Sequence, residues 1–223
     1  LRWIVMTVVP PSFQLAGWIP AWWRGVVGGD DMLELLDAQT VSVLAELRDR
    51  TSALTAYCPA LGVSALPGPR PSTEIAVAAG EAVVLHGRDR AQSHLLVPEA
   101  GRWTLLECGT PRPVDLDVRQ AEAEMAEAVV HAEHAIRTQQ VAFTVDPAKA
   151  AARPLPPDAD SQRKGLLVRA VRLWTAVAAV PPEQRTAELQ EVLRTAARAT
   201  LAAYAPQSIG AGQRRPRHAR RSA

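Results

Sequence analysis

Two glutamates and two histidines on one segment form the most suggestive polar pattern of the sequence. Glu124, Glu127, His131 and His134 follow one another at spacings of three, four and three residues, which aligns their side chains along one stripe of a helix. Carboxylates and imidazoles on one face can bind zinc or iron, and a catalytic metal keeps one position open. The pattern is not HExxH, and no second helix offers matching ligands. A solvated helix face is therefore the favoured interpretation, and a metal-dependent enzyme is one alternative.

Nucleophilic catalysis would need a serine or cysteine held by a histidine and an orienting acid. No G-x-S-x-G, Walker A or G-x-G-x-x-G motif surrounds any candidate. The two cysteines are expected to be reduced thiols in the core, and two histidines near facing ends of neighbouring strands are expected to pair across the sheet as packing residues. The sequence thus predicts no catalytic residue and no cofactor. The candidates considered are Ser93, Cys58, Cys108, His86, His94 and Asp89.

An arginine cluster near the C-terminal end is the strongest electrostatic feature. Arg214, Arg215, Arg217, Arg220 and Arg221 lie in a stretch without acids, although the whole chain carries a formal charge of only +2. Guanidinium groups neutralise phosphates and release counterions, which gives salt-sensitive binding without sequence preference. Aromatic residues for base stacking do not interleave with them. A disordered, solvated tail is the favoured interpretation, and weak nucleic-acid binding or attachment to an acidic protein or membrane surface are the alternatives.

The composition is that of a globular protein with a helical core. Hydrophobic residues make up 48% of the chain, charged residues 22% and aromatic residues 4%, and abundant alanine favours helix packing over a large sheet. Two cysteines in 223 residues are too few for a disulfide scaffold. No apolar run reaches the roughly 18 residues of a transmembrane helix. We therefore expect a cytoplasmic protein with one compact domain and a smaller helical appendage.

The first element that the sequence predicts is a helix over residues 32–54. Asp31 followed by Glu34 resembles a capping box, and leucines then recur close to helical spacing. The stretch 62–72 contains three prolines and is predicted to be a loop.

Further along the chain, strands precede helices. Three short apolar runs at 82–85, 94–97 and 103–106 are separated by hairpin-sized spacers and predict a three-stranded antiparallel meander. Amphipathic periodicity predicts helices over 118–140, 162–180 and 183–204, of which the last two form an αα-hairpin. The fold class is therefore α+β and helix-dominant, with a small three-stranded meander packed against helices and followed by a C-terminal αα-hairpin.

The chain is expected to divide at its irregular and proline-rich segments. Four of the six tryptophans fall within the first 23 residues, before Met32, and a start at Met32 rather than Leu1 is one interpretation of this end. Prolines between residues 146 and 160 indicate a linker. The predicted units are an irregular Trp-rich N-terminal extension (1–31), an α+β core (32–145), a Pro-rich linker (146–160), a helical hairpin (161–205) and a disordered basic tail (206–223).

The leading functional hypothesis is a non-catalytic intracellular accessory protein that docks on an unknown protein partner. It depends on absent catalytic motifs and on amphipathic helices in an Ala-rich chain. Weak nucleic-acid binding through the arginine tail and metal-dependent catalysis on the Glu124–His134 stripe are the alternatives.

Overall fold

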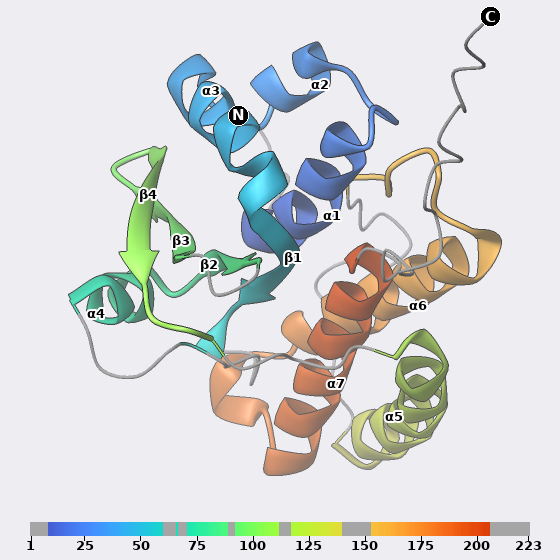
Figure 1. Cartoon of the computed structure of the whole chain (residues 1–223). Helices are drawn as coiled ribbons and strands as arrows, with labels where there is room; N and C mark the ends of the chain where they lie inside the picture. Colours follow the sequence, from blue (N-terminus) through green and yellow to red (C-terminus); the bar gives the residue numbers. More distant parts are fainter. Residues whose placement is uncertain are drawn as a thin grey trace, which may run out of the picture.

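The computed structural model describes residues 9–59, 66, 71–88, 92–111, 117–139 and 153–205, which form an antiparallel sheet and a larger set of helices (Figure 1). The α+β class is confirmed. In chain order the elements are α1 (Pro11–Trp23), α2 (Gly29–Leu33), α3 (Ala38–Leu47), the 3-10 turn η1 (Arg48–Arg50), β1 (Thr51–Tyr57), α4 (Pro71–Ala79), β2 (Ala82–Gly87), β3 (Ser93–Glu99), β4 (Arg102–Cys108), α5 (Val118–Gln139), α6 (Ser161–Ala178), the 3-10 turn η4 (Pro182–Gln184) and α7 (Ala187–Tyr204).

The sheet has four strands in the described part of the chain, one more than predicted. Its order is β1-β2-β3-β4 with every neighbouring pair antiparallel, so the meander predicted for β2 to β4 is confirmed and β1 is added at its edge. The helix predicted over 32–54 is wrong at its end, because α3 stops at Leu47, the turn η1 follows, and residues 51–54 belong to β1. The part that is helical is divided between α2 and α3, since the Asp37 carboxylate accepts a hydrogen bond from Thr40 N (2.9 Å) and starts a new helix.

Helices cover both faces of the sheet. Side chains that alternate along the strands divide into two clusters: Leu54, Leu85 and Leu96 join the large core that includes α1, whereas Val84 and Leu95 pack in a smaller cluster with α4. The loop predicted over 62–72 is wrong at its last two residues, because Pro71 is the first residue of α4.

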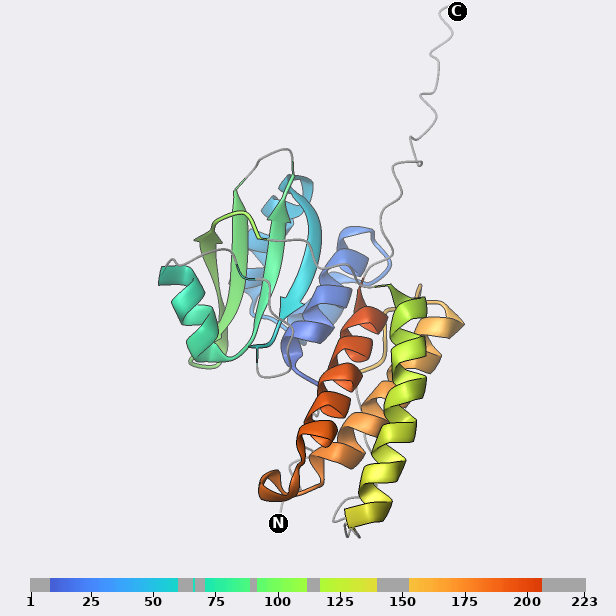
Figure 2. The ribbon, with the colours of Figure 1, turned by 90° about the horizontal axis from the view of Figure 1, so that it is seen from below.

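Residues 9–31 correct the prediction of an irregular N-terminal extension over residues 1–31, of which residues 1–8 lie outside the described part. Helix α1 begins at Pro11 and lies between the sheet and the helices α5 to α7 (Figure 2). Phe13 and Ile19 are fully buried, and Leu15 is 1% exposed. A helix that is covered on nearly all sides has no polar stripe, and its sequence therefore lacks the amphipathic periodicity by which surface helices are recognised.

The predicted C-terminal hairpin is confirmed, and it packs on the rest of the molecule. Helices α6 and α7 lie side by side, α5 packs on α7, and α7 also contacts α1 (Figure 2). The rings of Phe13 on α1 and Trp174 on α6 have centroids 6.2 Å apart. The sheet, α1 and the hairpin thus share one hydrophobic core.

Residues 153–160 are bound to α1 and do not form a free linker. The Trp18 indole N–H donates to Pro154 O (3.1 Å), and the Arg153 guanidinium lies 4.5 Å from the centre of the Trp18 ring. Arg24 and Asp158 form an ion pair at 2.6 Å. Residues 146–152 lie outside the described part, and the domain boundaries themselves stay a prediction.

Helix length and hydropathy can also be compared with what a bilayer requires. Within the described ranges, none of the helices is both long enough and apolar enough to cross a membrane.

Candidate protein-interaction groove

The Glu124–His134 stripe lies on α5 as predicted. Glu124, Glu127 and His131 line a shallow groove between α5 and α7, together with Glu188 and Glu191, and Arg198 closes it with an ion pair to Glu191 (3.2 Å). Glu127, His131 and His134 are exposed, as on a solvated helix face. Among the residues that the structure describes, His, Cys, Asp and Glu side chains form no group of three or more that could hold a metal ion.

The structure describes every candidate for nucleophilic catalysis except Asp89. The Ser93 hydroxyl accepts a hydrogen bond from Gly87 N (3.0 Å), and Cys58 and Cys108 are buried thiols at the ends of two opposite edge strands. The predicted pairing of His86 with His94 is wrong, because the register places His94 opposite Leu85 and thus sends the two imidazoles to opposite faces of the sheet.

His86 faces Thr55, with 2.8 Å between Nε2 and the hydroxyl oxygen, and burial lowers the pKa of its imidazole. Asp89 and the arginines Arg214, Arg215, Arg217, Arg220 and Arg221 lie outside the described residues.

A different feature, which the sequence did not predict, lies at the edge of the sheet. β4 is a terminal strand, and Pro98 of β3 stands opposite Trp103. Proline has no N–H to donate, so Trp103 belongs to a pair whose backbone groups point away from β3. Pairs alternate along an antiparallel ladder, and therefore Leu105 and Glu107 also direct their N–H and C=O groups outward. Neither has a backbone partner on that side among the described residues.

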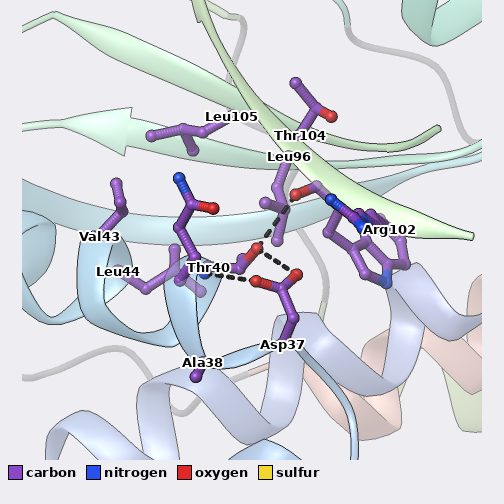
Figure 3. Close-up of a pocket in the computed structure, with 11 residues that line it drawn as sticks. Asp37, Ala38, Thr40, Val43, Leu44, Leu96, Arg102, Thr104 and Leu105 are labelled. Carbon is purple, nitrogen blue, oxygen red and sulfur yellow. Dashed lines mark hydrogen bonds between the residues drawn. The ribbon is translucent and has the colours of Figure 1, made fainter.

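Helix α3 lies beside this edge and forms a groove with it. The groove has a volume of about 740 Å³. Val43, Leu44, Leu96 and Leu105 supply apolar walls, and their side chains gather between α3 and the strands in Figure 3. Trp103 and Leu105 are only partly buried, so apolar surface and unpaired strand backbone are exposed side by side. The polar lining consists of Asp37, Gln39, Thr40, Arg102 and Thr104.

The N-terminus of α3 is fixed to β4 through side chains. The Thr40 hydroxyl lies 2.8 Å from Asp37 Oδ2 and 3.1 Å from Trp103 O, so its single proton is shared between two acceptors (Figure 3). The hydrogen bonds from the Thr40 backbone N–H and hydroxyl hold the pKa of Asp37 below its ordinary value. These contacts occupy the outward carbonyl of Trp103 and leave the edge open from Leu105 onward.

Helix α1 holds the other end of α3. The Trp23 indole N–H donates to Leu44 O (3.1 Å), and both residues are buried. The wall of the groove is therefore anchored in the main core. Such a preformed groove lowers the ordering cost of binding.

The sequence contained one usable signal for this site. Trp103 and Leu105 stand two residues apart on the last of three short strands and so share one face, and a terminal strand with an apolar face is a pairing surface. The signal was missed because the sequence does not show that α3 leaves this edge uncovered.

The comparisons with known proteins are limited to one family. Residues 12–120, just under half of the chain, match the family model described as Rv1486c-like protein, N-terminal domain. No curated protein and no solved structure matches the chain. The matched part begins in α1 and ends in the first turn of α5, so it contains the whole sheet and the groove between α3 and β4, whereas most of α5 and all of α6 and α7 lie beyond it.

Proposed function

We propose that this chain is a protein-interaction module that takes up an extended segment of a partner protein as an additional strand beside β4. The observation that carries the proposal is the outward-facing backbone of Leu105 and Glu107, which has no partner among the described residues and lies next to the apolar groove of α3. In strand addition, main-chain hydrogen bonds supply affinity and pockets for alternate side chains supply specificity.

The groove also defines the chemistry of the bound segment. An added strand sends every second side chain toward α3, where Val43, Leu96 and Leu105 form apolar walls. The bound segment should therefore alternate between apolar and polar residues. Arg102 at the end of the groove favours an acidic residue at the corresponding end of the segment.

Removal of one backbone N–H, that of Glu107, tests the proposal. Glu107 is exposed and its N–H points away from β3, so Glu107→Pro removes no bond of the existing ladder but prevents the edge from donating to a new strand. Glu107→Ala is the matched control, because it removes the same side chain and keeps the N–H.

The assay uses the full chain and a displayed library of short peptides. Peptides selected on the wild-type protein are expected to bind Glu107→Ala within about threefold and Glu107→Pro at least about tenfold more weakly, since main-chain hydrogen bonds contribute about 1 kcal/mol each and the proline ring adds a clash. Circular dichroism verifies that both variants are folded. Peptides that bind the proline variant as tightly as the alanine variant, or a selection that enriches no alternating sequence, would show that β4 is not the binding edge.

A further inference from the structure

A second groove lies between α5 and α6, away from the sheet. Helix α7 packs closely on both helices, whereas α5 and α6 diverge and contact each other much less (Figure 2). The space between them measures about 660 Å³, and its apolar floor consists of Met125, Val129 and Leu173 with two alanines. A groove of this kind between the helices of a bundle is a place where a further helix can pack.

Large apolar side chains remain exposed on the same two helices. Val129 is 39% exposed, Val130 63% and Val168 49%. The other large apolar side chains that are exposed in the described part lie on α2 and α4. Of these three valines, Val129 lines the groove, and an exposed apolar side chain in an apolar groove marks a contact surface.

The charges on this face are complementary between the two helices. Glu122 lines the groove from α5, whereas Arg169 and Arg172 line it from α6, which contains no acid. By helical spacing, Glu133 lies about one turn beyond Val129 on the side of α5 that lines the groove. Arg172 lines the groove from α6. Neither of these two forms an ion pair with a residue that the structure describes. By contrast, Glu122 and Arg169 at the same groove already pair at 2.5 Å.

We propose that the α5–α6 face binds a second copy of this chain about a two-fold axis, with α5 of each copy over α6 of the other. A two-fold interface must be complementary to itself, and this face carries glutamates on α5 and arginines on α6. The arrangement closes four helices around the apolar floor of the groove, which includes Val129, and brings Glu133 of one copy to Arg172 of the other. It is independent of peptide binding at β4, which lies in the part of the molecule formed by the sheet.

The test measures self-association of the full chain by sedimentation equilibrium from about 5 to about 500 µM, the range in which small interfaces dissociate. The wild type is expected to form a dimer in this range. Val129→Glu places a carboxylate in the apolar floor and is expected to raise the dimer dissociation constant by more than about tenfold. Val77→Glu is the matched control, because Val77 on α4 is 53% exposed and lies on a different face.

A charge exchange makes the test specific for this geometry. Glu133→Arg and Arg172→Glu each place like charges opposite one another and are expected to weaken the dimer at least about tenfold. The double variant restores opposite charges and is expected to recover dimerisation to within about threefold of the wild type.

Three results would each overturn the proposal. The first is a monomer over the whole concentration range. The second is a dimer that Val77→Glu weakens as much as Val129→Glu does. The third is a double variant no tighter than its single variants.

Discussion

Substituting alanine for Gly17 tests how tightly α1 packs on the C-terminal hairpin. A Cβ atom at Gly17 would lie 2.8 Å from Tyr204 O and 3.1 Å from Tyr204 Cδ1. Tyr204 cannot easily withdraw, because it is 2% exposed and its hydroxyl donates a hydrogen bond to Arg153 O. The added methyl group therefore forces two helix backbones apart.

The expected change in the free energy of unfolding follows from two opposing effects. Overpacking a well-packed core lowers the free energy of unfolding by about 1–3 kcal/mol, and alanine in place of glycine inside a helix raises it by about 1 kcal/mol. Gly165 on α6 is the matched control, since no atom lies within 4 Å of its added Cβ. Only the propensity gain applies there, so Gly17→Ala should be about 1–3 kcal/mol less stable than Gly165→Ala.

Urea unfolding followed by tryptophan fluorescence measures this difference. With a slope of about 2 kcal/mol per molar urea, the two midpoints should differ by about 0.5–1.5 M. Equal stabilisation by both alanines would refute the reasoning, because it would mean that α1 does not approach α7 at Gly17 and that the N-terminal helix is not part of the core.

Two further substitutions test single polar groups. Burial lowers the pKa of His86 below that of an unfolded histidine, near 6.5, so its contribution to the free energy of unfolding is complete above about pH 6.5 and decreases as the pH falls below that value. Between pH 7.5 and 5.5, the urea midpoint of His86→Gln should therefore decline less than that of the wild type. An equal decline in both proteins would contradict this prediction. Tyr204→Phe should lower the free energy of unfolding by about 1–2 kcal/mol, because Arg153 O loses its donor. Tyr57→Phe is the control and should lower it by less, because the Tyr57 hydroxyl has no hydrogen bond to a described residue. Equal losses would contradict the role of the hydrogen bond between Tyr204 and Arg153.

Segments with a clear period were predicted well. α5 matches its prediction to within one residue, and α6 and the meander strands to within two, because amphipathic stripes and turn residues are local signals. The predictions that failed concern elements whose partners lie far away in the chain. α1 is buried between distant elements and thus has no stripe, and β1 was missed because its pairing with β2 depends on residues about 30 positions further along.

The candidate site was harder to predict than the fold, for a related reason. The sequence analysis searched for residue types that perform chemistry and selected Glu124 to His134, which lie on a largely solvated helix face. The groove depends on backbone groups of Leu105 and Glu107, which every residue possesses, and on a helix that leaves them uncovered. A strand edge becomes a site through its position, and its residue types give little sign of it.

The positions of the two proposed surfaces also limit how they can act on one another. The β4 edge and α3 are fixed to the core through Trp23 and Thr40, whereas the α5–α6 face lies beyond α7 on the other side of α1 (Figure 2). If α1 and the hairpin form one rigid core, as the contact between Gly17 and Tyr204 indicates, dimerisation leaves the geometry of β4 unchanged. A dimer then presents two equivalent edges at a fixed separation, and a partner with two extended segments gains affinity by binding both edges at once.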